Sequence, residues 1–477
     1  MSSFKCLAVP LALLSGLAQA APLDEKLTTQ ADQKAVAVTI YNNDLALVKD
    51  QRQVNLGVDV NKLAWRDVAA HMQPETALLR NLTEEKGFRV VEQHFDFDLL
   101  TPQTLLEKYV GKQVTVINTN PATGVETREP ATVLATNGGT VLKFGDRIET
   151  GVPGRLAFAG VPDNLRDRPT LVMSVMNPHA GLQNLELSYL TGGLSWRADY
   201  VAELSSQDDK MDLNGWVTLT NQSGTSYRNA RLQLVAGDVN RVQPAMQTPM
   251  LRGKMQTQMA EAAPLAQENL FEYHLYTLDR PTTLAEQQTK QVALLSATGI
   301  PVRKSLELHG AEYYYQGSYG DLGQKIKVGV FLEFDNKGGG LGVPLPKGVM
   351  RLYKKDSAGN AQFIGEDRID HTPKNERVRL KLGDAFDVTA DTKQTDFQKI
   401  TGGGRYNNVF ESAYQITIKN AKNQPVTVKV FEPMPGDWQV LSESLPHTKA
   451  NAGTALWQVP VAAEGKTVLT YRVRVKY

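Results

Sequence analysis

The sequence predicts a multidomain protein that is mainly β, with β-sandwich units, one small inserted barrel and few short helices. Apolar and polar residues alternate with a period of two in many short segments, as in residues 471–477, where Tyr and Val alternate with Arg and Lys. Gly, Asn, Asp or Pro bound most of these segments, which is typical of strands joined by turns. The length of 477 residues is enough for several domains of roughly 100–200 residues.

Residues 1–20 predict a secretory signal peptide. A basic start that contains Lys5 precedes a mostly apolar run at 6–17, and Ala18-Gln19-Ala20 is a small-x-small cleavage site. We therefore expect a periplasmic protein that begins near Ala21, with secretion as the alternative. The apolar run is shorter than the ~20 residues that cross a bilayer. No other stretch approaches that length, so we expect no transmembrane segment in the mature chain.

The charge balance argues against a nucleic-acid partner. The chain has 52 Lys and Arg against 51 Asp and Glu, with no long basic run, whereas a surface that binds a duplex needs clustered cations. The single cysteine, Cys6, lies in the predicted signal peptide, so the mature chain would have no thiol nucleophile. No residue pattern predicts a cofactor.

Residues 21–100 are predicted to form an N-terminal β module, and residues 101–165 a compact insert. Thr101 is a plausible N-cap for a helix at 102–109. Five short strands joined by tight turns follow at 113–118, 130–136, 140–144, 147–150 and 155–158. A helix with five short strands is typical of a small SH3-like or Sm-like barrel. The insert lacks a basic groove with interleaved aromatic residues, which favours a spacer or partner-binding role over nucleic acid.

The remaining strands fall into two further regions. Residues 166–242 are predicted to begin a central β domain that continues at 271–410, with one short helix at 283–295. Residues 221–224 are predicted to form a hairpin turn, as are residues 356–360. Residues 411–477 form a last unit that is immunoglobulin-like (Ig-like) in size and strand spacing.

Residues 243–270 differ in composition from everything around them. They are rich in Gln and Ala and contain three prolines, which predicts a flexible exposed loop or, as the alternative, a marginal helix. Two near-copies of Met-Gln-Thr-x-Met lie within them. Because soft sulfur ligands favour soft ions, the four thioethers could hold Cu(I). The alternative is that they pack adaptably against a partner or simply occupy a loop. These candidate metal ligands are Met246, Met250, Met255 and Met259.

The segment 189–200, Tyr-Leu-Thr-Gly-Gly-Leu-Ser-Trp-Arg-Ala-Asp-Tyr, followed by Asn-Gln-Ser-Gly at 221–224, resembles a known family. It is the bacterial family catalogued as domain of unknown function 4139, which includes mucoidy-inhibitor-A-like proteins. The resemblance implies an exported or envelope-linked β protein and supplies no reaction, ligand or catalytic residue. Within this segment Trp196 and Tyr200 are predicted to pin one sheet to the next, rather than to stack on a ligand.

Patterns that carry chemistry are scarce. The seven histidines are scattered without a His-Glu-x-x-His motif, and the glycine-rich stretches at 338–342 and 402–404 lack the Lys-Ser or Lys-Thr of a phosphate loop. One acidic cluster remains, at Glu366, Asp367 and Asp370. On a strand, Glu366 and Asp370 would share one face, and such carboxylates could act as acid and base or bind a cation. The alternative is a solvated strand face in which Arg368 neutralises them.

The sequence therefore predicts an exported cell-envelope protein that binds or scaffolds and has no enzymatic role. Its partner would be an envelope protein or glycan. The alternative is a carboxylate-dependent enzyme that acts on envelope glycan through Glu366, Asp367 and Asp370. Binding of Cu(I) by the methionine-rich loop is a further alternative.

Overall fold

The structure is a computed structural model that describes residues 24–96, 98–162, 165–237, 239–240, 266–270, 273–400, 406 and 408–476. It is mainly β, as the sequence predicts, and α1 (Pro102–Lys108) is the α-helix of the described residues. Two compact units divide the chain. Unit 1 comprises residues up to 37, 47–192 and 223–227, and unit 2 comprises 38–46, 193–222 and 228 onward. The predicted signal peptide lies outside the described residues.

Unit 1 contains a four-stranded sheet in the order β1-β4-β12-β6, in which β1 is parallel to β4 and the other pairs are antiparallel. A second set of strands pairs β13 with β5 and with β3. Strands β12 and β13 lie in the part of the sequence predicted as the central domain, yet they complete sheets begun by residues 25–96. The bounds are β1 (Glu25–Thr28), β3 (Leu45–Leu56), β4 (Asp59–Arg66), β5 (Leu78–Asn81), β6 (Arg89–Asp96), β12 (Thr170–Asn177) and β13 (Gly181–Thr191).

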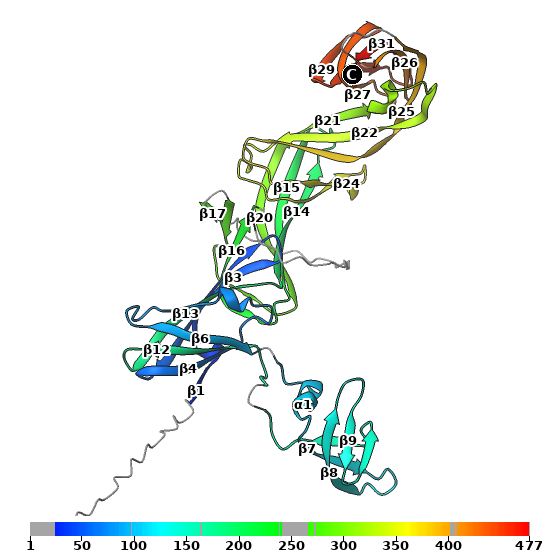
Figure 1. Ribbon diagram of the computed structural model, residues 1–477. Helices are drawn as coiled ribbons and strands as arrows, with labels where there is room; N and C mark the ends of the chain where they lie inside the picture. The colour runs from blue at the N-terminus through cyan, green and yellow to red at the C-terminus, as the bar shows by residue number, and fades with distance from the viewer. Residues whose placement is uncertain are drawn as a thin grey trace, which may run out of the picture. The chain divides into compact units, whose positions relative to one another are not determined.

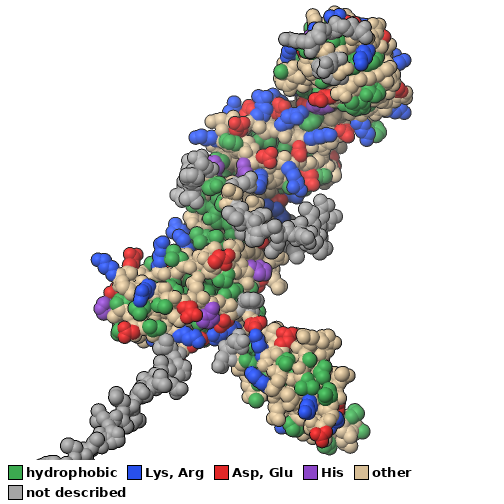
Figure 2. All heavy atoms as spheres, in the orientation of Figure 1, with side chains coloured by type: hydrophobic (Ala, Val, Ile, Leu, Met, Phe, Trp, Pro, Cys, Tyr) green, Lys and Arg blue, Asp and Glu red, His purple; other side chains and the backbone are tan. Residues whose placement is uncertain are grey.

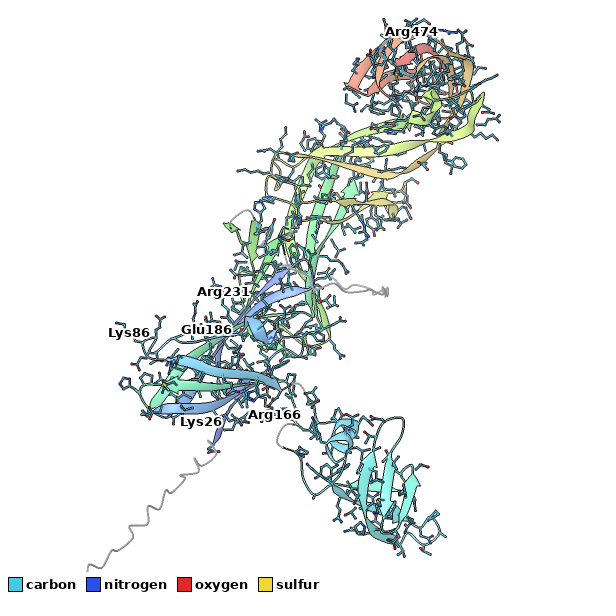
Figure 3. All side chains as sticks on the ribbon, in the orientation of Figure 1. Lys26, Lys86, Arg166, Glu186, Arg231 and Arg474 are labelled. Atoms are coloured by element: carbon cyan, nitrogen blue, oxygen red, sulfur yellow. The ribbon has the colours of Figure 1, made fainter. Side chains whose placement is uncertain are left out.

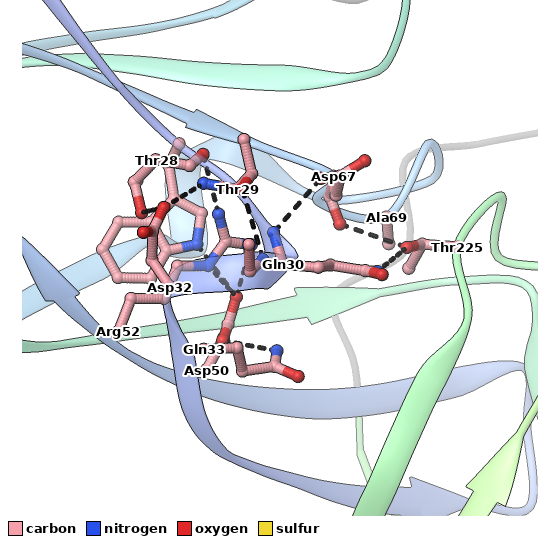
Figure 4. A network of polar contacts seen from close by, with 12 residues as sticks. Thr28, Thr29, Gln30, Asp32, Gln33, Asp50, Arg52, Asp67, Ala69 and Thr225 are labelled. Atoms are coloured by element: carbon pink, nitrogen blue, oxygen red, sulfur yellow. Dashed lines mark hydrogen bonds and ion pairs between the residues drawn. The ribbon is translucent and has the colours of Figure 1, made fainter.

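A buried ion pair lies in the core of unit 1 (Figure 4). Arg52 Nε donates to Asp50 Oδ2 at 2.9 Å, and both side chains are almost fully buried. The Trp65 indole N–H donates to the same carboxylate at 2.9 Å, and the Arg52 guanidinium lies 4.7 Å from the Trp65 ring. Arg52 also donates to the Thr28 carbonyl at 2.9 Å. The pair therefore connects β3 to β4 and β1 through charge-assisted hydrogen bonds.

Replacing Arg52 by Met should destabilise unit 1 strongly, because it leaves the Asp50 carboxylate buried without its counter-ion. We expect a loss of ~3–5 kcal/mol in the free energy of unfolding, measured by urea unfolding. The matched control is Arg66→Met, which removes the exposed pair with Asp167 and should cost at most ~1 kcal/mol. Equal losses in the two variants would contradict the prediction.

Residues 101–162 form a module with its own core (Figure 1). The Thr101 hydroxyl caps α1 by accepting from the Thr104 N–H, as predicted. Five strands follow in the order β10-β9-β8-β7-β11, close to the predicted ranges. Leu106 and Tyr109, in α1 and at its C-cap, pack against buried strand residues such as Val116. The bounds are β7 (Gln113–Thr119), β8 (Glu126–Ala135), β9 (Val141–Phe144), β10 (Arg147–Thr150) and β11 (Arg155–Ala157).

Unit 2 contains two large sheets. The first is five-stranded in the order β20-β15-β14-β23-β24, and the second is nine-stranded in the order β28-β31-β26-β25-β22-β21-β27-β30-β29. The first is built from β14 (Leu194–Leu204), β15 (Lys210–Asn221), β20 (Gln288–Pro301), β23 (Gly348–Lys355) and β24 (Ala361–Ile369). The second is built from β21 (Arg303–His309), β22 (Asp321–Asp335), β25 (Arg377–Lys399), β26 (Val409–Asn420), β27 (Val426–Pro433), β28 (Asp437–Glu443), β29 (His447–Asn451), β30 (Thr454–Val461) and β31 (Lys466–Lys476).

The C-terminal residues share their core with earlier strands. Trp457 and Tyr471 pack in one cluster with Leu306, Val328 and Tyr315, the last from η3 (Glu312–Tyr315). Because β21, β22 and β25 supply part of the sheet and the core, residues 411–477 do not form a sheet by themselves. The Ig-like arrangement of this unit stays a prediction.

A third group of strands in unit 2 pairs β16 with β2, β18 and β19, and β18 with β17. The prediction of a flexible loop is wrong for its last residues, because 266–270 form β17 by pairing with β18. The bounds are β2 (Gln33–Tyr41), β16 (Tyr227–Ala236), β17 (Ala266–Leu270), β18 (Tyr273–Thr277) and β19 (Thr282–Leu284). Single 3-10 turns occur at η1 (Gln30–Asp32) and η2 (Pro74–Thr76).

Two local predictions are wrong. In place of the predicted helix at 283–295 the structure has the end of β19, a turn at 285–287 and the first part of β20, because β20 pairs with β15 and this long-range ladder overrides helix propensity. The predicted hairpin at 221–224 is a crossing between two sheets, since β15 pairs with β14 and β20 while β16 pairs elsewhere. Gly224 has φ +86°, and a Cβ there would lie 2.4 Å from the Ala70 Cβ, so this close approach requires glycine. The predicted hairpin at 356–360 is confirmed, between β23 and β24.

Candidate functional site

The acidic cluster lies on and just after β24, with the alternation that the sequence predicts. Glu366 and Asp370 are exposed, Asp367 is half-buried and Ile369 is buried. Glu366 lies directly opposite Arg351 on β23, and the Arg351 Nε is 3.1 Å from its carboxylate. Arg351, rather than the predicted Arg368, is therefore the cation that neutralises Glu366.

Asp367 fastens β24 to β25, which belongs to the other large sheet of unit 2. Its carboxylate accepts from the Lys381 N–H at 2.7 Å and from the Arg368 N–H at 2.8 Å. Beside it, Gly365 has φ +150°, and a Cβ there would lie 2.3 Å from the Leu382 carbonyl oxygen. β24 and β25 are therefore in contact where they cross, and the Asp367 carboxylate accepts hydrogen bonds from backbone N–H groups there.

Replacing Asp367 by Ala should destabilise unit 2 by about 1–2 kcal/mol, because two backbone N–H groups lose their acceptor. Chemical unfolding of the purified protein measures this difference. Ala at Glu366 or at Asp370 is the matched control, and each should change the stability by less than about 0.5 kcal/mol. The structural role of Asp367 would be contradicted if all three variants were equally stable.

A hollow of about 240 Å³ lies between the same two sheets. Its apolar lining comes from both sheets: Leu204 and Ile364 from the five-stranded sheet and Leu332 and Leu382 from the nine-stranded one. Asp208, Lys304, Lys354 and Asp384 also line it. None of Glu366, Asp367 and Asp370 does.

Asp208 joins the two lysines of the hollow. It lies in the turn after β14 with φ +60°, and its two carboxylate oxygens accept from Lys304 at 2.7 Å and Lys354 at 2.5 Å. Partial burial opposes its ionisation, but the two lysine hydrogen bonds outweigh that effect and lower the pKa of the carboxyl. Sequence reasoning missed this group, because the three residues are separated by about 50 to 150 positions.

A second hollow of about 190 Å³ is lined by two histidines, His274 and His371, together with Tyr276 and Pro344. The His371 Nδ1 accepts from the Lys347 N–H at 3.2 Å, and the Tyr276 hydroxyl donates to the Pro344 carbonyl at 2.9 Å. The part of the chain that the structure describes holds no group of three or more His, Cys, Asp or Glu side chains placed to bind a metal. The methionine pairs at 246–259 lie outside the described residues.

The aromatic pair of the 189–200 segment is part of the core, as predicted. Trp196 and Tyr200 are buried. The Trp196 indole N–H donates to the Val235 carbonyl on β16 at 3.3 Å, so it connects two sheets of unit 2. The Tyr200 hydroxyl donates to the Pro346 carbonyl at 2.8 Å.

Cross-strand ion pairs cover the exposed sheet faces. Acidic and basic side chains are interspersed over the visible surface (Figure 2). On the nine-stranded sheet Arg474, labelled in Figure 3, pairs with Glu411 on the neighbouring strand. On the same sheet Arg379 pairs with Glu307.

One carboxyl differs from all of these because it is buried among tyrosines. Glu432, on β27, accepts from the Tyr315 hydroxyl at 2.8 Å, and the Tyr471 hydroxyl lies 2.9 Å from that of Tyr315. A Cβ at Gly310 would lie 2.0 Å from the carboxylate, so no larger residue fits there. Burial raises the pKa of the Glu432 carboxyl to about 7, against the lowering effect of the tyrosine hydrogen bonds.

This carboxyl should make the stability of unit 2 depend on pH. The unfolded chain ionises Glu432 near 4.5, whereas the folded chain retains the proton to about 7, so stability falls as pH rises between these values. The loss would be roughly 3 kcal/mol at pH 8, at ~1.4 kcal/mol per pKa unit. Glu432→Gln should remove this dependence. The measurement is the difference in unfolding free energy between variant and wild type from pH 4.5 to 8.

Glu366→Gln, at an exposed position, is the control for this pH series. Its unfolding free energy should depend on pH in the same way as that of the wild type. If the Glu432→Gln difference is flat with pH, the carboxyl is already ionised in the folded protein and the prediction is wrong.

The sheets and the candidate site define a multi-sheet β protein. Its candidate polar side chains are held mainly by hydrogen bonds and ion pairs within the chain. The chain belongs to the family described as Domain of unknown function (DUF4139), which matches residues 185–477. No curated protein matches the sequence. Within the described ranges, none of the helices is long and apolar enough to cross a membrane.

Proposed function

We propose that this protein is a non-enzymatic binding or scaffolding component of the cell envelope, and that the module at 101–162 is its partner-binding part. The observation that carries this proposal is that the module has a core of its own. Its buried cluster runs from Leu106 to Phe144 and draws only on residues of the module. It therefore contributes no core to the rest of unit 1, and its role lies outside the stability of the fold.

The chain closes across the base of the module. Leu100 N–H donates to the Arg166 carbonyl at 2.8 Å, and Arg166 N–H donates to the Asp98 carbonyl at 3.0 Å. The Arg166 side chain, labelled in Figure 3, also pairs with Glu25 and Asp96 of the four-stranded sheet. Because these contacts involve no residue of the module, the two ends stay fixed whether or not the module is present.

The surface of the module supports binding rather than burial in the fold. Ile148, on the edge strand β10, is 61% exposed, and Val125, just before β8, is 60% exposed. Arg147, the chain neighbour of Ile148, pairs with Glu129. An exposed apolar side chain on an edge strand, next to a charge, is typical of surfaces that pair with another polypeptide.

The envelope location rests on residues 1–20, where a basic start, an apolar run and Ala18-Gln19-Ala20 support export. Two of the carboxylates considered for glycan chemistry have structural partners. Glu366 is paired with Arg351, and Asp367 accepts hydrogen bonds from backbone N–H groups, so both hold strands together. These contacts favour the non-enzymatic role over glycan chemistry.

A photo-crosslinking residue placed at Ile148 in intact cells should capture a defined envelope partner, identified by mass spectrometry. The matched control is the same residue at Val58, which is 55% exposed and also in unit 1. The proposal predicts capture at Ile148 and none of that partner at Val58.

Export also predicts the N-terminus of the mature chain. The N-terminal peptide of the purified protein, read by mass spectrometry, should begin at Ala21.

Replacing residues 101–164 by a short Gly-Ser linker should abolish capture of this partner. Because Ile148 is deleted with the module, the photo-crosslinker is placed at a second position for this test. The melting temperature of unit 1 should stay within a few degrees of the wild-type value. Capture of the same proteins at Ile148 and at Val58 of the full chain, or an unchanged cellular phenotype after deletion of the module, would argue against the proposal.

A further inference from the structure

The hollow between the two large sheets of unit 2 combines an apolar lining with two ammonium groups at its edge. Leu332 is fully buried and Leu204 nearly so, whereas the Lys304 and Lys354 side chains are 37% and 31% exposed. The charged groups are therefore accessible from solvent, and the apolar lining runs from these buried leucines to the half-buried Ile364 and Leu382. This arrangement is typical of a site for a small amphiphile, with few polar groups that orient an apolar ligand.

The charges of the hollow favour an anion with one negative charge. Lys304 and Lys354 carry two positive charges and Asp208 carries one negative charge. Asp384, which also lines the hollow, is 4.0 Å from Lys381, so these three cations and two carboxylates leave one positive charge. A doubly charged phosphate would be repelled by Asp208, whereas a single carboxylate would balance the site.

The two ammonium groups have donors to spare for such a ligand. A lysine ammonium has three N–H donors. Within the described residues, Lys304 and Lys354 each give one hydrogen bond, in both cases to Asp208. A ligand carboxylate could therefore accept from both lysines beside Asp208 without breaking the contacts that join the sheets.

The size of the hollow limits the apolar part of the ligand. Its volume of about 240 Å³ is below the ~300–1,000 Å³ of sites for drug-sized molecules. A Cβ built on Gly383, which lines the hollow, meets no atom within 4 Å, so open space lies beside the backbone there. A short aliphatic chain fits these dimensions, and a large cofactor does not.

We propose that this hollow binds a short apolar chain that carries one carboxylate, held by Lys304 and Lys354 with its tail against Leu332, Ile364 and Leu382. The inference goes beyond the proposed function, because it concerns unit 2 and does not involve the module at 101–162. Free fatty acids and polypeptide C-termini with an apolar last residue share this chemistry.

Isothermal titration calorimetry of the full mature chain with octanoate tests the proposal. Octanoate should bind at least tenfold more tightly than octanamide, which has the same tail without the charge. An acetylated tripeptide Ala-Ala-Leu with a free carboxylate, compared with its amide, distinguishes a polypeptide C-terminus from a fatty acid as the source. Equal binding of charged and neutral forms in both pairs, or no binding of any probe at millimolar concentration, would overturn the proposal.

Variants locate the site. Lys304→Met and Lys354→Met should each weaken octanoate binding about tenfold, and Ile364→Phe should weaken it by filling the hollow while keeping both lysines. Asp208→Asn should strengthen it several-fold, because it removes the competing carboxylate, an effect that mere loss of folding cannot produce. Lys355→Met, a neighbouring exposed lysine paired with Glu203, is the control and should bind as the wild type does. Octanoate binding that is unchanged in the Lys304, Lys354 and Ile364 variants would place the ligand elsewhere and overturn the proposal.

Discussion

Two aspartates fasten the five-stranded sheet of unit 2 to its nine-stranded sheet, and much of the unit depends on this junction. Asp208 bridges Lys304 of one sheet to Lys354 of the other, and Asp367 accepts from the backbone of β25. A hollow with an apolar lining lies between the same two sheets, and Asp208 is one of the residues that line it. One of the two carboxylates that hold the junction is therefore also part of the candidate binding site.

The buried acids of the two units illustrate two solutions to one physical problem. Asp50 is paired with the buried cation Arg52, and it also accepts from the Trp65 indole N–H. Glu432 instead accepts from the Tyr315 hydroxyl, and burial raises the pKa of its carboxyl to about 7. This second arrangement makes the core around β27 sensitive to pH.

The two candidate binding regions have different physical characters. The module at 101–162 is an inserted body with its own core, exposed apolar residues and an edge strand, which suits contact with another polypeptide. The hollow of unit 2 is small, lined by apolar residues and bordered by lysines, which suits a single short ligand.

The sequence by itself determined the β class, the helix capped by Thr101 with its five strands, and the alternation around Glu366, because period-two patterns and caps are local signals. Tertiary structure decided the rest. Pairing with β15 made residues 288–295 of the predicted helix a strand, and β12 and β13 joined the sheets of unit 1. The group of Asp208, Lys304 and Lys354 arises only where separate strands meet, since no local pattern records which distant strands become neighbours.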